Sequence, residues 1–196
     1  MHLRIPPIWR GPLLGLVYLL AWLCLWPTQA AYWNLLAGWR LGMLLLTPAR
    51  YWPWLIAAEW GGSAIADVWV DHARTLAFVL GDMPDVLVTA LCVGIVQRLG
   101  TRPALHSPDN VVRLLASALF VALAATAADA ALITFIHQGL HLTGMIGVLG
   151  GELLGDYLGM LLVAPVLILL VRDRPRGNAL RTLLLDGLIF LLPSLA

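Results

Sequence analysis

The sequence contains no lysine and few charged residues of either sign. All 12 basic residues are arginine, and charged residues make up only 12% of the 196-residue chain, whereas hydrophobic residues make up 61%. A soluble domain carries about a quarter charged residues, and one core of this size cannot hide so much apolar surface. The mean hydropathy of +0.87 therefore predicts an integral membrane protein. The net charge of +1 provides no broad field that would attract nucleic acid.

Cysteine is also scarce, and the common catalytic motifs are missing. Cys24 and Cys92 each fall inside an apolar run, so a disulfide is not expected, and no Cys-x-x-Cys spacing suggests a metal site. The sequence has no Walker loop, HExxH, GxSxG or GxGxxG motif. We therefore expect neither an enzyme nor a resident cofactor in this chain.

Apolar segments recur at the length of about 20 residues that a membrane-spanning helix needs. They lack the alternation of barrel strands, so the pattern predicts an all-α polytopic transmembrane helix bundle. The first segment follows basic residues, as in a signal peptide, but we interpret it as a retained span because more spans follow. The fourth is expected to be broken near Asp82, Pro84 and Asp85. The seven predicted spans are 11–27, 31–47, 52–70, 76–99, 111–136, 144–171 and 179–196.

The arginines alternate with these spans. If every segment crosses the membrane, ten of the 12 arginines fall on one side, which the positive-inside rule assigns to the cytoplasm together with the N-terminus. Arg74 falls on the other side, and Arg40 lies within a span. The seventh span would run outward and stop at Ala196. We therefore expect residues 1–196 to be a membrane domain that is incomplete at its C-terminus.

Two charged residues lie deep in the predicted second and third spans. Arg40 and Glu59 each lie about 10 Å from the cytoplasmic ends of these spans, at 1.5 Å per residue, so an ion pair between them is expected. A charge at this depth needs a reason, because burying it in lipid costs about 2.5–3.5 kcal/mol. The pair either fixes the register of the helix hairpin or forms a polar site for a ligand or partner helix. Trp60 is a further candidate for lining such a site.

The sixth span carries glycine at every fourth residue, in the order Gly147, Gly151, Gly155 and Gly159. A smooth glycine face lets another helix approach closely, so helix packing is its expected role. Glu152 and Asp156 lie beside this face. Paired carboxyl groups either share a proton or hold a cation, or they are satisfied by Tyr157 or by backbone groups. Both interpretations stay open.

A third polar group is expected near the outer face of the membrane. It would form an acidic vestibule containing histidine for a cation, metal or basic ligand, or it would simply reflect the exclusion of arginine from outer loops. Within it, His137 and His141 are weak metal or haem candidates, because Gly139 and a loop position argue against a helical pair. The members are Asp67, Asp71, His72, Asp82, Asp85, Asp129, His137 and His141.

Several short motifs carry a family resemblance. They are Gly38, Arg40, Leu41 and Gly42, then Pro48, Tyr51-Trp52-Pro53 and Ala58-Glu59-Trp60, with AWLCLW at 21–26 and the 155–169 helix that contains Gly155, Asp156 and Pro165. This pattern resembles the first (MASE1) type of bacterial membrane-associated sensor domain, and more closely the membrane part of hexose-phosphate uptake sensor histidine kinases. The resemblance implies about eight spans and a cytoplasmic histidine kinase, diguanylate cyclase or phosphodiesterase beyond them.

These observations predict a sensory input module in the bacterial inner membrane, which relays a ligand or partner-protein signal to a cytoplasmic output domain. The expected sensing residues are Arg40, Glu59, Trp60, Glu152 and Asp156. The expected partners are the lipid bilayer, a second copy or another membrane protein, and the output domain, but no nucleic acid. A small multi-pass transporter or channel-like protein is the alternative, because carboxyl groups and glycine-rich helices inside the membrane also suit a permeation path. A purely structural membrane subunit is a third possibility, favoured by the glycine face.

Overall fold

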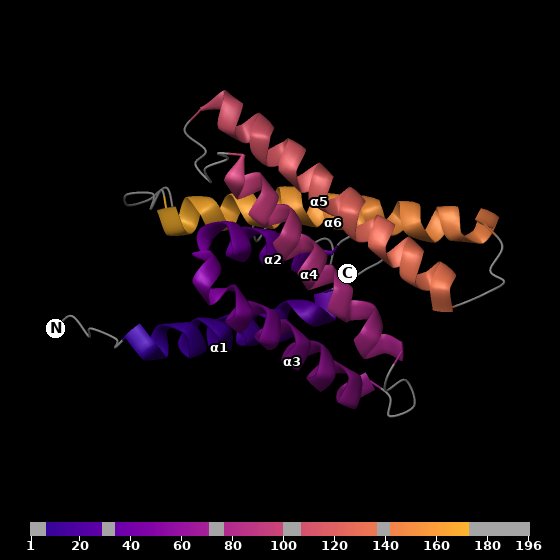
Figure 1. The fold of residues 1–196 in the computed structure, drawn as a ribbon, viewed down its shortest axis with the longest axis horizontal. Helices are drawn as coiled ribbons and strands as arrows, with labels where there is room; N and C mark the ends of the chain where they lie inside the picture. Colours follow the sequence, from indigo (N-terminus) through magenta and orange to yellow (C-terminus); the bar gives the residue numbers. More distant parts are fainter. Residues whose placement is uncertain (1–6, 29–33, 71–76, 100–106, 137–141, 173–196) are drawn as a thin grey trace.

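The computed structural model describes residues 7–28, 34–70, 77–99, 107–136 and 142–172. Six α-helices and two short 3-10 turns make up this part of the chain, which confirms the all-α prediction (Figure 1). The predicted seventh span, 179–196, lies outside the described residues. The elements are α1 Pro7–Leu25, η1 Trp26–Thr28, α2 Leu35–Leu46, η2 Ala49–Tyr51, α3 Trp52–Val70, α4 Ala77–Arg98, α5 Pro108–Ile136 and α6 Leu142–Arg172.

Two of the described helices are long and apolar enough to cross a membrane. These stretches are Pro108–Leu132 in α5 and Ile146–Val171 in α6. In contrast, α2 has only 12 residues and is about 18 Å long, which is shorter than the roughly 30 Å hydrocarbon layer. The prediction of a full span at 31–47 is therefore not met in the described part. The cause is local, because Asn34 caps the start of α2 and Thr47 ends it.

The predicted break in the fourth segment is wrong. Helix α4 is continuous from Ala77 to Arg98, with Pro84 inside it. Proline removes the hydrogen bond to the carbonyl group four residues earlier, and here that carbonyl belongs to Leu80, close to the start of the helix. The helix runs through this position despite the lost hydrogen bond, and Asp85 is held in regular helix.

The helices pack in pairs around a buried centre. The most extensive contacts join α2 to α6, α1 to α3, and α4 to α5. In Figure 1, α1 and α3 lie on one side of the molecule and α5 and α6 on the other, with α2 between them. Leu41, Val93, Val121 and Ile168 are fully buried in this centre. In contrast, large apolar side chains such as Leu16, Leu91 and Leu123 are exposed, as expected where lipid replaces water.

Tryptophan rings cover glycines between α1 and α3. A Cβ atom at Gly62 would lie 2.6 Å from the ring of Trp22. One at Gly11 would lie 2.6 Å from a carbon of the Trp54 ring. Small residues on one helix thus accommodate large rings on the other, and this contact fixes how closely α1 and α3 approach.

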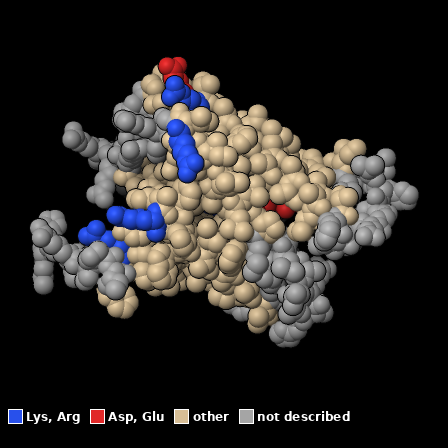
Figure 2. Space-filling model, viewed as in Figure 1, with Lys and Arg blue, Asp and Glu red and all other residues tan. Residues whose placement is uncertain are grey.

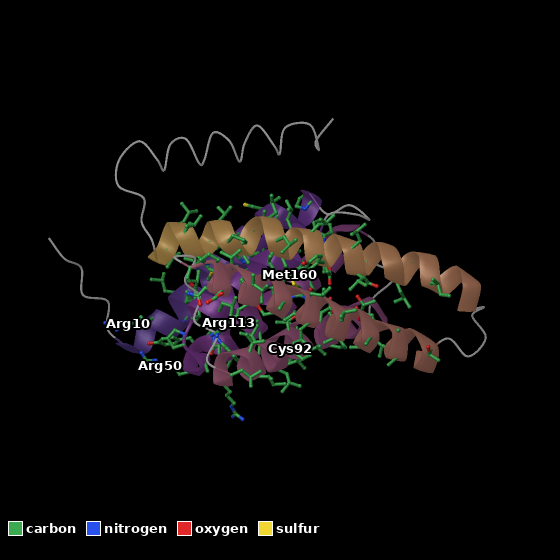
Figure 3. The ribbon with its side chains drawn as sticks, turned by 90° about the horizontal axis from the view of Figure 1, so that it is seen from above. Arg10, Arg50, Cys92, Arg113 and Met160 are labelled. Carbon is green, nitrogen blue, oxygen red and sulfur yellow. The ribbon has the colours of Figure 1, made fainter. Side chains whose placement is uncertain are left out.

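The arginines in view gather at one end of the molecule (Figure 2). Arg10, Arg50 and Arg113 lie at this same end, whereas Cys92 and Met160 lie farther along the bundle (Figure 3). The guanidinium group of Arg50 also stacks over the ring of Tyr51, 4.7 Å from its centroid. The described residues therefore carry the charge asymmetry that the positive-inside rule uses to orient membrane proteins.

At this end, side chains from two helices satisfy the last carbonyl groups of α2. The indole N–H of Trp52 lies 3.2 Å from the oxygen of Leu44 and 3.0 Å from that of Thr47. The amide of Gln97, near the end of α4, donates to the same Leu44 oxygen at 3.3 Å. Helix C-termini leave carbonyl groups without partners inside the helix, and here α3 and α4 provide those partners.

Candidate functional site

The centre of the bundle contains the expected ion pair between Arg40 and Glu59. Arg40, on α2, donates from Nε to Oε1 of Glu59, on α3, over 2.7 Å, and Nη2 lies 2.5 Å from the same oxygen. The second oxygen, Oε2, accepts a hydrogen bond from the hydroxyl of Tyr18, on α1. Only 6% of Arg40, 2% of Glu59 and 1% of Tyr18 is exposed. Both oxygens of this carboxylate therefore have partners, from two different helices.

The chain places these groups together by simple geometry. The turn between α2 and α3 brings Arg40 and Glu59 within reach of each other, although α2 packs mainly on α6 and α3 mainly on α1. The ring of Trp39 lies 5.9 Å from that of Tyr18, between centroids, so an aromatic contact supports the hydroxyl that reaches Glu59. Because removing one partner of a buried ion pair leaves an uncompensated charge, each of the three polar side chains depends on the others. We call Tyr18, Arg40 and Glu59 the closed triad.

Arg40 also faces a second carboxylate. Its Nη1 atom lies 3.4 Å from Oδ2 of Asp85, on α4. In the described part of the chain, neither Nη1 of Arg40 nor Oδ1 of Asp85 has a hydrogen-bond partner. The guanidinium group is thus fully bonded toward Glu59 and only loosely paired toward Asp85. Sequence analysis assigned Asp85 to the outer vestibule, but α4 brings it beside Arg40.

Asn34 connects the start of α2 to α6. Its side-chain oxygen accepts from the backbone N–H of Ala37 at 3.3 Å, which caps α2. Its Nδ2 atom donates to Oδ1 of Asp156 over 2.7 Å, and its own backbone N–H bonds the oxygen of Gly155 over 3.2 Å. Asp156 is 3% exposed. Asn34, rather than Tyr157, is therefore the partner that the structure gives to this carboxyl group.

Four carboxyl groups from three helices form a second polar group, which we call the acid cluster: Asp85 on α4, Asp129 on α5, and Glu152 and Asp156 on α6. The carboxyl group of Asp129 has the other three as its electrostatic neighbours and lies within hydrogen-bonding range of Asp85. It also lies within hydrogen-bonding range of Glu152. Glu152 and Asp156 interact with each other, as their spacing of one helical turn predicts. Asp129, expected in the outer vestibule, instead lies between α4 and α6.

Glycines allow α2 and α6 to approach at backbone distance. A Cβ atom at Gly159 would overlap the backbone oxygen of Asn34, and one at Gly38 would overlap that of Gly159. One at Gly42 would lie 2.6 Å from the side chain of Leu167. The packing role expected for Gly159 is therefore present, and Gly38 and Gly42 form the opposing surface. Gly155 is buried at the same contact, through its bond to Asn34.

The predicted residues Gly147, Gly151 and Trp60 are less buried than the glycines at the contact between α2 and α6. Within the described part of the chain, a Cβ atom at Gly147 would meet nothing within 4 Å, because this end of α6 extends past α2, so its predicted packing role finds no contact there. Gly151 is partly buried. The indole N–H of Trp60 is buried without a partner among the described residues, and Trp60 and Glu59, as successive residues, point about 100° apart around α3.

Other family-motif residues support the helix ends and the core. Leu41 is fully buried in the core. Pro48 precedes η2, and Pro53 lies in the first turn of α3, where proline is tolerated. Pro165 lies inside α6, next to Ala164, whose backbone lies near Gly42.

Most residues of the predicted outer vestibule lie outside the described part of the structure. Asp71, His72, His137 and His141 lie outside the described residues, as do the side chains of Asp67 and Asp82. Where the structure does describe side chains, no three histidine, cysteine, aspartate or glutamate groups are placed to hold a metal ion.

Sequence reasoning missed Tyr18 and Asn34. Tyr18 is the only tyrosine of the first apolar segment and lies halfway along it, which is a polar position in lipid. Asn34 stands directly before an apolar helix, and asparagine is a preferred N-cap residue. Both signals were present in the sequence, but neither identified the carboxyl group that each residue would contact.

Comparison with known proteins identifies the chain. The family model MASE1 matches residues 9–193, which is almost the whole length. No match was found among curated proteins or among solved structures. Domains of this family are membrane-associated sensor domains and are typically non-catalytic. The chain belongs to the MASE1 family and is a membrane sensory input module of a signalling protein.

Proposed function

We propose that this domain crosses the bacterial inner membrane several times and relays a ligand or partner-protein signal to a cytoplasmic histidine kinase or cyclic-di-GMP enzyme. Among such proteins, the hexose-phosphate uptake sensor kinases are the proposed nearest type. The arginine-rich end, with the N-terminus, faces the cytoplasm. The positive-inside rule and the gathering of arginines at one end support this orientation (Figure 2).

One observation carries the proposal: every described helix contributes a polar side chain to a single network around Arg40. Tyr18 belongs to α1, Glu59 to α3, and Asp85 to α4. Asp129 joins from α5 and Asp156 from α6, through their interactions with Asp85 and Arg40. Polar groups inside a membrane are rare and are functional by default. A network that touches all six helices is well placed to couple their positions.

The network has two arrangements within reach. In the structure Arg40 is hydrogen-bonded to Glu59, whereas its contact with Asp85 is an ion pair without a hydrogen bond. A small movement of α4 toward α2 would give Asp85 a hydrogen bond from Nη1 and tighten the contact between these helices. A signal changes the balance only if it binds the two arrangements with different affinity. Arg40, Glu59, Glu152 and Asp156 are therefore the proposed sensing residues, now joined by Asp85; Trp60 borders them on α3.

The expected partners follow from the outer surface of the bundle. Exposed apolar side chains on α1, α4 and α5 face lipid. The first half of α6 offers an apolar face that includes Ile146 and Val148, exposed by 68% and 66%, next to Gly147. This face is proposed to contact a second copy or a partner membrane protein, since small residues there allow close helix approach.

The test compares two substitutions in the full-length signalling protein, with output activity measured in membranes. Glu59→Gln weakens the bond between Arg40 and residue 59 and frees Arg40 to pair with Asp85. Asp85→Asn removes that competing partner. We expect the two variants to change basal output in opposite directions. Asp109→Asn, at the exposed start of α5, is the matched control and should leave output unchanged. Normal output from both test variants, at normal membrane levels, would exclude the network as the sensing centre.

The transporter alternative draws on a specific observation, the row of carboxyl groups from α4 through α5 to α6. Such a row also suits a permeation path. Proton or cation flux in proteoliposomes that contain the full-length protein would support this alternative. Output that responds to Glu59→Gln without any flux would support the sensory function.

A further inference from the structure

The acid cluster and the closed triad together contain more negative groups than one cation can balance. This network contains five carboxyl groups and one guanidinium group, that of Arg40. Glu59, Asp85 and Asp156 interact with Arg40 directly, and Asp129 and Glu152 interact with Asp85. Among the described residues, Arg10, Arg50 and Arg113 lie at the arginine-rich end of the bundle rather than beside this network (Figure 3). Ionised groups inside a membrane are costly unless they are paired. The complete cluster is therefore unstable in its fully ionised form.

The geometry of the cluster also requires a proton. Asp129 lies within hydrogen-bonding range of both Asp85 and Glu152. An ionised carboxylate only accepts hydrogen bonds, whereas a protonated one also donates. The contacts from Asp129 to its two neighbours are attractive only if a proton lies between them. Asp129 is the central member and the natural carrier of that proton.

Further buried groups beside the cluster lack partners. Nη1 of Arg40 lies 3.4 Å from Oδ2 of Asp85 and has no hydrogen bond to any described residue, although more than nine-tenths of Arg40 is buried. Thr89 lies one turn after Asp85 on α4, is completely buried, and has a hydroxyl without a partner. The same is true of the buried hydroxyl of Thr126, one turn before Asp129 on α5. Polar groups of this kind normally have partners, so the site is built for an occupant or for a second arrangement.

A metal ion does not fit this site as described. The described residues contain no set of three carboxyl, histidine or cysteine groups placed around one point. A carboxyl group that bonds its neighbours one by one, as Asp129 does, is suited to a proton instead. Protons are also the smallest species that neutralise carboxylates inside a membrane.

We propose that the acid cluster is a proton-binding site, in which Asp129 carries a proton shared with Asp85 and Glu152 and thereby controls whether Asp85 pairs with Arg40. With the proton present, Asp85 accepts a hydrogen bond from Asp129 and stays loosely paired with Arg40. When the O–H bond of Asp129 breaks, its proton passes to water at the outer face. The two carboxylates then repel each other, and Asp85 moves onto Nη1 of Arg40. As a signal, this inference rests on the proposed sensory function.

Every element that packs around the site contributes to the charge balance. Besides Asp129, the titratable and charged groups of the whole network are Tyr18 of α1, Arg40 of α2, Glu59 of α3, Asp85 of α4, and Glu152 and Asp156 of α6. Of these, Glu59 has both oxygens bonded, and Asp156 is bonded by Asn34. The carboxyl groups proposed to share the proton are therefore those of Asp85, Asp129 and Glu152.

Infrared spectroscopy of the full-length protein in proteoliposomes tests the proposal directly. Protonated carboxyl groups absorb separately from carboxylates, so a buried protonated group gives a band at roughly pH 6 to 8, where exposed carboxyl groups are ionised. We expect this band in the unmodified protein, its loss in Asp129→Asn, and its retention in Asp109→Asn. Glu152→Gln should shift the band without removing it, which covers the case in which Asp129→Asn does not fold.

Three results would overturn the proposal: no such band in the unmodified protein, an unchanged band in Asp129→Asn, or loss of the band on adding sodium ions at constant pH, which would make the site a metal-cation site. None of these depends on signalling output. If the band behaves as expected while Glu59→Gln and Asp85→Asn leave output unchanged, the proton site stands and the proposed sensory function fails. If the band is absent and output still responds, the sensory function stands without the proton.

Discussion

The closed triad and the acid cluster lie side by side and share Arg40, yet they are built differently. In the triad, the guanidinium group and the Tyr18 hydroxyl satisfy both oxygens of Glu59. In the acid cluster, Nη1 of Arg40, Oδ1 of Asp85 and the Thr89 hydroxyl have no hydrogen-bond partner among the described residues. The triad joins α1, α2 and α3 tightly, whereas the cluster leaves α4 and α5 with unused bonding capacity.

This difference suggests that the triad holds the helices together and that the acid cluster responds to a signal. A fully satisfied buried network fixes one arrangement of its helices, whereas a partly satisfied one has alternatives of similar energy. The triad therefore resembles the hairpin clamp and the cluster the responsive site, two roles that sequence analysis assigned to Arg40 and Glu59 as alternatives. Four substitutions, from the largest expected effect to the smallest, test whether the triad and the acid cluster differ in this way.

The largest effect is expected for Arg40→Ala, which removes the cation that both regions use. Glu59 and Asp85 would be left buried without a counter-charge, so the free energy of unfolding should fall by about 3–5 kcal/mol. Unfolding by sodium dodecyl sulfate in mixed micelles provides the measurement. The double variant Arg40→Ala with Glu59→Gln should recover part of this loss. A single variant as stable as the unmodified protein would contradict the view that the triad is a clamp.

Gly159→Ala should be the next most damaging change, because its new Cβ atom overlaps the backbone oxygen of Asn34. Overpacking of this kind costs up to about 3 kcal/mol, and here it also separates Asn34 from Asp156. Gly147→Ala is the matched control on the same helix. It should leave stability unchanged or raise it by up to about 1 kcal/mol, since alanine is the better helix former. Equal losses in both variants would show that the backbone contact is unimportant.

Tyr18→Phe tests the closed triad without changing the acid cluster. The variant keeps the ring beside Trp39 and removes only the hydroxyl that bonds Glu59. A hydrogen bond to a charged group contributes about 1.5–3 kcal/mol, so we expect a loss in this range, measured by the same unfolding assay. Tyr51→Phe, in the turn before α3, controls for the loss of a tyrosine hydroxyl elsewhere.

Thr89→Val should have the smallest effect. The hydroxyl is buried without a partner, so replacing it by a methyl group should change stability by less than about 1 kcal/mol or even increase it. A clear loss would mean that the hydroxyl is bonded in the membrane, and the acid cluster would then be as well satisfied as the triad. Thermal unfolding of the two proteins in the same detergent distinguishes these results.

Some of this architecture could be predicted from sequence and some could not. The pairing of Arg40 with Glu59 was predictable because the short turn between α2 and α3 leaves the two residues at similar distances from it. Asp85 and Asp129 were misplaced because their partners come from helices far apart in the chain, and linear distance from a loop does not show which helix faces which. Likewise, glycine spacing identified α6 as a packing helix, but only the short length of α2 decides that Gly159 is covered and Gly147 is not.

The side chains of Trp52 and Gln97 both bond the Leu44 carbonyl and so tie α2, α3 and α4 together at their arginine-rich ends. Because these three helices are joined at one end, they can separate only at the opposite end. Rearrangement around Arg40 would thus separate or close the opposite ends of these helices while their arginine-rich ends stay fixed. In the proposed orientation, motion toward the cell interior would then depend on α6, which packs on α2 through glycine.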